Sequence, residues 1–500
     1  MRGFTALDSA WPEPSREPKA VASLPDARVP RKPNPGIKQM TSNDRPTAEQ
    51  RFALGKSIRK QVPRTSHALW QPDALRPDPI GLLEEQNQSR VDWLVPVRRA
   101  RMMASPFAFC RAGARIMATD LRTTPVTGLM VQACGDAHLA NFGLFASPER
   151  ALVFDLNDFD ETLQGPWEWD LKRLAASFTI AGRHNELDRD SIRKATLRVV
   201  QTYREAMNEF AGRRTLDVWY SLLKAEEIEA WANSQRGAKR IASATAKART
   251  RNHYQALDSL AEEIDGQYRL KSEPPLLVPL REISEKLDYI TQQLIRESYQ
   301  AYVENAAPHC RVLLDRYRPV DFALKVVGVG SVGTRCCILL LEGRDRHDPL
   351  LLQIKEATDS VLAEHLPPSP YQNQGRRVVE GQRLMQVASD IFLGWTRTSE
   401  TGNDFYWRQL RDWKGSANIE SMRATDLKRY ARLCGWTLAR AHARSGDPIA
   451  IAGYLGSSDT FDQALAEFAE RYADQNERDY EAFVNAIRSG RLEADDESCF

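Results

Sequence analysis

The sequence has few of the features that place a protein in a membrane, in an oxidising compartment or around a zinc ion. Its seven cysteines form no C-x-x-C pair and no Cys/His cluster with zinc spacing, so we interpret them as reduced thiols. No apolar run approaches the ~18 to 20 residues that span a bilayer, and the N-terminal residues contain no continuous apolar segment of a signal peptide. These absences predict a cytoplasmic protein without membrane contact.

An excess of charge of one sign is also missing. The 69 basic and 67 acidic residues nearly cancel, and no long block of one sign interrupts the chain. Charge therefore indicates neither a nucleic acid nor an anionic membrane as a partner. The densest basic stretch, residues 239–251, is typical of a solvated helix face.

Length and hydrophobic spacing predict an α+β protein with more than one packed part. Residues 1–46 hold eight of the 27 prolines and little periodic hydrophobicity, which predicts a disordered tail. The further parts that we expect are a helical lead-in at 47–128, a helical lobe at 129–310, a sheet lobe at 311–415 and a final helical segment at 416–500.

Strand-like patterns occur in two separate regions of the chain. The first region predicts strands at 129–134, 142–145 and 151–156. The second predicts strands at 325–329, 334–342, 350–356, 391–398 and 405–410. Helical spacing predicts one helix within the second region, at 376–387, and a long helix at 461–487.

The first region contains a pattern suited to phosphoryl transfer. Gly135-Asp136-Ala137-His138-Leu139-Ala140-Asn141 follows a predicted strand. Its spacing lets one loop present a general base, Asp136, and a metal ligand, Asn141, to the same cavity. The acidic segment 155–161 follows the next hairpin, where a second metal ligand is expected. We expect His138 to hydrogen-bond the loop backbone rather than to bind a metal.

The second region contains a glycine loop, Gly328-Val329-Gly330-Ser331-Val332-Gly333. A Rossmann loop would be followed by a helix, but residues 334–341 are strand-like. This context favours a hairpin loop that lies over the phosphates of a nucleotide. We expect Gly328, Gly330, Ser331 and Gly333 to bind the nucleotide.

These motifs resemble the protein kinase-like superfamily, especially its aminoglycoside phosphotransferase and choline kinase branches. The catalytic loop of those enzymes is similar to G-D-x-H-x-x-N, and their metal-binding Asp opens a D-[FW]-[DE] step that precedes a structural Asp. The resemblance implies that Asp158, in Asp158-Phe159-Asp160, binds Mg²⁺, with Asp155 as the alternative ligand. It also implies that Asp170 has the structural role.

The same resemblance assigns a catalytic and nucleotide-binding role to Lys355, at the end of a predicted strand. Its implied ion-pair partner is Glu380, on the following helix, and Glu364 is a competing partner. Residues 438–443 resemble the helix that precedes the catalytic loop in these enzymes. In this chain the glycine loop and that helix follow Asp136 instead of preceding it, so we expect a circularly permuted, kinase-like fold with two lobes.

Residues 134–176, with Ser105-Pro106-Phe107-Ala108-Phe109 upstream, also resemble an uncharacterised bacterial family. That similarity extends from about residue 50 to the end of the chain and implies no established activity.

The expected function is therefore an ATP- and Mg²⁺-dependent phosphotransferase that acts on a hydroxyl, more in keeping with a small molecule than with a protein. Nucleotidyl transfer of AMP and a non-catalytic, nucleotide-binding scaffold are the alternatives. A dinuclear metallophosphoesterase would use Asp136 and His138 as ligands, but its G-D-x-x-D and G-N-H-[DE] motifs are missing. The acceptor and the oligomeric state have no signature in the sequence.

Overall fold

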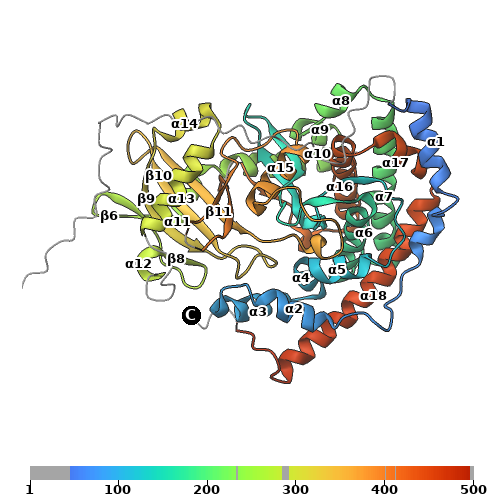
Figure 1. Ribbon diagram of the computed structural model, residues 1–500, viewed down its shortest axis with the longest axis horizontal. Helices are drawn as coiled ribbons and strands as arrows, with labels where there is room; N and C mark the ends of the chain where they lie inside the picture. The colour runs from blue at the N-terminus through green and yellow to red at the C-terminus, as the bar shows by residue number, and fades with distance from the viewer. Residues whose placement is uncertain (1–44, 232–234, 284–291, 400, 411–412, 496–500) are drawn as a thin grey trace, which may run out of the picture. The chain divides into compact units, whose positions relative to one another are not determined.

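Six antiparallel strands form the main sheet of the computed structural model, which describes residues 45–231, 235–283, 292–399, 401–410 and 413–495 (Figure 1). The strand order is β12-β13-β11-β10-β9-β8. These strands are β8 (Leu277–Pro279), β9 (Arg318–Lys325), β10 (Cys336–Glu342), β11 (Pro349–Ala357), β12 (Gly394–Arg397) and β13 (Asp404–Gln409).

Helices cover both faces of this sheet, which explains why its central strands are apolar at successive positions. Side chains alternate between the faces of a strand. In β10, Leu339 and Leu341 pack in one cluster with residues of α13 (Gln292–Asn305) and α14 (Pro308–Leu314). Ile338 and Leu340 pack in another cluster, with residues of α11 (His253–Leu260).

A helical core contains most of the other long elements. Its helices are α1 (Ala48–Ile58), α6 (Trp167–His184), α7 (Arg189–Gly212), α16 (Ala424–Ser445), α17 (Pro448–Leu455) and α18 (Thr460–Arg488). Leu171, Leu174 and Phe178 follow helical spacing on α6 and are fully buried. This apolar stripe anchors α6, whose first turn carries Asp170.

The other strands form three smaller antiparallel sheets. They pair β1 (Met130–Ala133) with β4 (Leu163–Pro166), β6 (Ala261–Ile264) with β7 (Gln267–Leu270), and β14 (Gly415–Ser416), β2 (Phe142–Ala146), β3 (Leu152–Leu156) and β5 (Leu223–Lys224) in that order. The remaining α-helices are α2 (Pro79–Asn87), α3 (Val95–Met103), α4 (Pro106–Ala112), α5 (Ala114–Leu121), α8 (Thr215–Trp219), α9 (Ala225–Ala230), α10 (Gln235–Thr250), α12 (Leu280–Ile283) and α15 (Gln374–Met385).

The α+β class and most predicted elements are confirmed, but two details of the sheet differ. The strand predicted at 325–329 is wrong, because β9 already ends at Lys325. The sheet also begins before residue 311, since β8 pairs with β9 through Leu277 and Lys325. Residues 48–500 form one compact unit, and most of the predicted tail at 1–46 lies outside the described residues.

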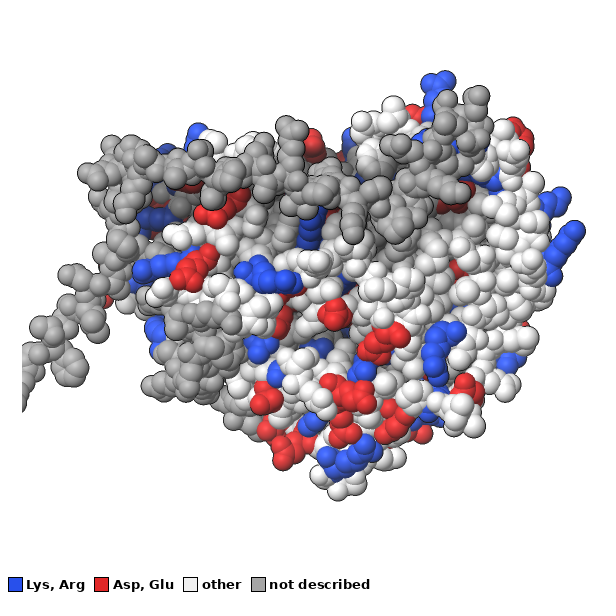
Figure 2. Space-filling view, in the orientation of Figure 1, with Lys and Arg blue, Asp and Glu red and all other residues white. Residues whose placement is uncertain are grey.

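The distribution of charge on the surface and the polarity of the helices agree with the expectations from the sequence in the described ranges. On the face shown in Figure 2, basic and acidic side chains are interspersed. Every helix in these ranges is too short or too polar to cross a lipid bilayer. The six cysteines that the structure describes are buried and free of disulfides.

Candidate active site

The loop that carries Asp136 is held at its start by Asp170. The Asp170 carboxylate accepts hydrogen bonds from the backbone N–H groups of Cys134 (2.6 Å) and Gly135 (2.9 Å). His442 of α16 lies with Nε2 3.1 Å from Asp170 Oδ2. Gly135 has a φ of +83°, and a Cβ at this position would lie 2.2 Å from the Glu161 carbonyl oxygen, so only glycine fits here. These contacts fix the loop against α6, α16 and the acidic segment.

Asp136 is paired with an arginine that the sequence motifs did not reveal. Arg173 donates to Asp136 Oδ1 from Nε (2.8 Å) and from Nη2 (2.5 Å). Burial raises the pKa of Asp136 to about 6, although Arg173 opposes this shift. Arg173 follows Asp170 by three positions on α6, so the two side chains share one helix face. That spacing is the signal that could have identified Arg173.

The other two polar residues of the loop have different tasks. His138 is buried, and its Nδ1 accepts a hydrogen bond from the Ala140 N–H (3.2 Å), as predicted. Asn141 donates from Nδ2 to the Asp136 carbonyl oxygen (2.8 Å). This bond uses the amide nitrogen of Asn141 and leaves its side-chain oxygen available for a ligand.

Lys355 and the acidic segment meet although 195 positions separate Lys355 from Asp160. Lys355 Nζ lies 2.5 Å from Asp160 Oδ2 and 3.8 Å from Asp158 Oδ1. Tyr406 also donates to Asp160, at 2.6 Å. Burial would lower the pKa of Lys355, but the two carboxylates outweigh it and raise that pKa well above its usual value. Burial would raise the pKa of Asp160, and Lys355 reverses this, so the pKa is lowered.

The predicted ion pair between Lys355 and Glu380 is not formed. Glu380 pairs with Arg383 at 3.6 Å, one turn along α15, while Lys355 pairs with the two aspartates. The side chain of α15 that reaches the acidic segment is Arg377, which donates to the carbonyl oxygens of Thr162 (2.6 Å) and Asp160 (2.8 Å). Glu364, the competing partner, pairs with Arg115.

Asp155, the alternative metal ligand, lies elsewhere in the core. Its buried carboxylate is hydrogen-bonded to Arg440 of α16. Burial raises the pKa of Asp155, and Arg440 opposes that shift. Asp158 Oδ1, in contrast, is buried without a hydrogen-bond donor among the described residues. The geometry therefore favours Asp158 as the ligand.

The glycine loop is held by Arg90, which lies between α2 and α3, and by Arg101 of α3. Arg90 donates to the Val332 carbonyl oxygen (2.5 Å), and Arg101 donates to that of Gly328 (2.6 Å). Gly333 has a φ of +89°, a conformation that favours glycine. Ser331 Oγ lies 3.4 Å from Asp160 Oδ2.

One cavity of about 680 Å³ joins these segments. Of the predicted site residues, the cavity is lined by Asp136, Asn141, Asp158, Gly328, Gly330 and Ser331. Lys355 is buried next to Asp160, and neither Gly333 nor Glu380 belongs to the lining.

Two arginines of the lining, Arg90 and Arg111, carry charge that sequence reasoning missed. Arg90 and Arg111 each have a buried Nε without a hydrogen-bond acceptor in the described part of the chain. Burial lowers the pKa of both guanidinium groups, that of Arg90 to about 10. Burial also raises the pKa of Glu161 to about 7. The cavity thus places unpaired guanidinium nitrogens opposite a group of carboxylates.

A family model described as "Uncharacterized protein conserved in bacteria (DUF2252)" matches residues 90–486. The chain belongs to this family. The family match includes the Asp136 loop, the acidic segment, the glycine loop and Lys355. No curated protein and no solved structure matches the chain.

Proposed function

We propose that this protein of the DUF2252 family is an ATP- and Mg²⁺-dependent phosphotransferase that acts on the hydroxyl of a small molecule. The observation that carries the proposal is that the Asp136 loop and the acidic segment line the same cavity as the glycine loop. Ser331 of the glycine loop lies 3.4 Å from Asp160, and Lys355 Nζ lies 3.8 Å from Asp158 Oδ1. Phosphoryl transfer needs a base, metal ligands and positive charge at one place, and these segments supply each of them.

Asp136 is the proposed general base. With a pKa of about 6, its carboxylate is mostly ionised at neutral pH and can accept the proton of an acceptor hydroxyl. Arg173 binds only Oδ1 of this carboxylate, and Asp136 lines the cavity. Oδ2 is therefore the oxygen that we assign to the acceptor.

Asp158 and Asn141 are the residues that would hold Mg²⁺. Within the described ranges, no group of three or more His, Cys, Asp and Glu side chains is arranged to hold a metal. One carboxylate and one amide oxygen suit Mg²⁺, which commonly uses one or two protein carboxylates and completes its shell with water and substrate phosphates. The buried, undonated Oδ1 of Asp158 supports the assignment. Bound Mg²⁺ would neutralise charge on the phosphates.

The arginines of the cavity are the proposed phosphate contacts. Arg111 has no ion-pair partner in the described part of the chain, and its Nε is buried without an acceptor. An anionic ligand would restore the interactions that burial removes from this guanidinium group. Lys355 lies outside the lining, so its proposed role is to orient Asp158 and Asp160 and to add positive charge behind them.

The fold assignment that accompanies this proposal is a circularly permuted, kinase-like arrangement with two lobes. The antiparallel strands β9 to β13 would form the nucleotide lobe, and the helices around α6 and α16 would form the catalytic lobe. The contact of His442 with Asp170 supports this assignment, because the helix that resembles the one before the catalytic loop reaches that loop from the far end of the chain.

The experiment that tests the function is ATP consumption by the purified protein with pooled metabolites, followed by mass analysis of the products. We expect an added phosphate on a small molecule, and an added AMP would instead indicate nucleotidyl transfer. Asp136→Asn should lower the rate, whereas Asp258→Asn, a change to an exposed acid of α11 outside the cavity, should not. ATP binding without any product would support the non-catalytic scaffold.

A further inference from the structure

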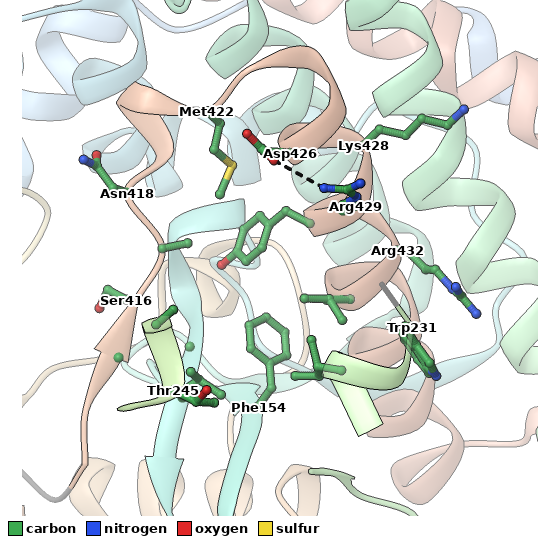
Figure 3. Close-up of a pocket in the computed structure, with 18 of the residues that line it drawn as sticks. Phe154, Trp231, Thr245, Ser416, Asn418, Met422, Asp426, Lys428, Arg429 and Arg432 are labelled. Atoms are coloured by element: carbon green, nitrogen blue, oxygen red, sulfur yellow. Dashed lines mark ion pairs between the residues drawn. The ribbon is translucent and has the colours of Figure 1, made fainter. Parts of the chain in front are cut away.

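A second cavity, of about 990 Å³, lies apart from the candidate active site (Figure 3). Its walls come from β2, β3 and β14, from helices α9 and α10, and from the first half of α16. The two cavities share no lining residue. Its volume is near the upper end of the range of small-molecule sites, about 300 to 1,000 Å³.

The floor of this second cavity is apolar. It is lined by Leu144, Phe154, Ile228, Met422 and Leu433. Figure 3 shows Phe154 and Met422 pointing toward the middle of the cavity. Tyr430 adds only carbon to the floor, because its hydroxyl donates to the carbonyl oxygens of Leu139 (2.9 Å) and Phe142 (3.1 Å). The flexible thioether of Met422 lets this floor adapt to apolar ligands of different shapes.

The basic lining residues come from α7, from α16 and from Arg423, which directly precedes α16. The cavity is lined by five basic residues, Arg198, Arg423, Lys428, Arg429 and Arg432, and by one acid, Asp426. Asp426 lies 3.4 Å from Arg423 and 3.7 Å from Arg429, so it accounts for two of the five. Arg198, Lys428 and Arg432 have no carboxylate within ion-pair distance among the described residues.

Arg198 of α7 and Arg432 of α16 both line the cavity and lie close enough to interact electrostatically. Burial lowers the pKa of Arg432, and the charge of Arg198 lowers it further. Glu205 opposes these effects, but Gln201 donates to its carboxylate (2.8 Å) and no ion pair forms. The Arg432 guanidinium lies 4.2 Å from the ring centroid of Trp231, and Figure 3 shows the two side chains together at the edge of the cavity. Arg198 donates to Gln201 Oε1 (3.2 Å), and neither Arg198 nor Arg432 has an ion-paired acid among the described residues. Guanidinium groups in this state are suited to a carboxylate or a phosphate.

We propose that this cavity binds an amphipathic anion, with an apolar chain on the floor and one carboxylate or phosphate group at Arg198 and Arg432. The apolar floor accounts for the chain, and the unpaired arginines account for the head group. The inference does not depend on the proposed phosphotransferase activity, because binding is measured directly and no nucleotide is present.

The test is calorimetric titration of the full chain with dodecanoate, dodecyl phosphate and dodecanol, each below the concentration at which it self-associates. We expect at least one of the two anions to bind. The dissociation constant of the neutral alcohol should be at least about tenfold higher, because one charge-assisted hydrogen bond contributes about that factor to affinity. The anion that binds more tightly identifies the head group.

Variants connect binding to this cavity. Arg198→Gln with Arg432→Gln should weaken the anions about tenfold or more and leave dodecanol unchanged, while Leu433→Trp should fill the floor and weaken all three probes. Arg193→Gln, on the same helix but outside the lining, is the control. Thermal melts establish whether each variant folds. If the double variant does not fold, the single variant Arg198→Gln replaces it in the titrations. The proposal is overturned if neither anion binds, if dodecanol matches the anions, or if the arginine variants bind the anions as the wild type does.

Discussion

Replacement of Lys355 by methionine should destabilise the protein measurably, unlike the loss of a surface lysine. The side chain of Lys355 is 3% exposed, and those of Asp160 and Asp158 are 28% and 33% exposed. Breaking a buried ion pair costs ~3 to 5 kcal/mol, and an exposed pair is worth ~0 to 1 kcal/mol. Because the partners are partly exposed, we expect Lys355→Met to cost about 2 to 3 kcal/mol.

Urea unfolding of purified variants measures this cost. Lys224→Met, at an exposed position of β5, is the control and should change the free energy of unfolding by less than about 0.5 kcal/mol. Lys355→Met combined with Asp160→Asn should be more stable than Lys355→Met alone, because the second change removes the carboxylate that was left unpaired.

The dependence of this effect on pH follows from the lowered pKa of Asp160. A carboxylate with a folded-state pKa below its unfolded value of 3.8 stabilises the protein above that pH. The contribution is lost as the pH falls through the folded-state pKa. The difference between wild type and Lys355→Met should thus be largest near neutral pH and smallest in acid. A difference below about 0.5 kcal/mol at pH 7, equal to that of the control, would refute the buried ion pair.

Three further predictions concern the site. Asp136→Asn should reduce turnover by ~10²- to 10⁴-fold with nucleotide affinity retained, and the wild-type rate should rise with pH through about 6 as Asp136 loses its proton, which a pH–rate profile checks. Glu380→Gln should leave activity unchanged in a product assay, since the one ion-pair partner of Glu380 among the described residues is Arg383. Arg377→Gln should lower the unfolding midpoint, because Arg377 is buried and its guanidinium holds backbone carbonyls of the acidic segment.

The sequence was sufficient to predict the elements that depend on local patterns. Residues 334–342 were predicted as a strand, and β10 covers 336–342, because its apolar run is buried on both faces. The helix predicted at 461–487 is α18, whose apolar face follows helical spacing. The strand end at Lys325 was missed because the β-branched Val326 and Val327 have high strand propensity, whereas the chain leaves the sheet there toward the glycine loop.

The side-chain partners in the site could be predicted only in part. The spacing within a loop, as between Asp136 and Asn141, is local and can be read from the sequence. The partner of Lys355 is not local, because it depends on which carboxylate the packing of β11 brings nearest, and that carboxylate is Asp160. Asp155 and Asp158 are also alike in sequence. The contact that distinguishes them comes from Arg440, nearly 300 residues later, which is hydrogen-bonded to Asp155 and not to Asp158.

The measurement that tests the central proposal most directly is calorimetric titration of ATP, with and without Mg²⁺, into the wild type and Asp158→Asn. If the cavity is a nucleotide site, the wild type should bind ATP more tightly with Mg²⁺ than without it, and Asp158→Asn should lose most of that difference. Failure of the wild type to bind ATP in the presence of Mg²⁺, or an undiminished effect of Mg²⁺ in Asp158→Asn, would contradict the proposed site.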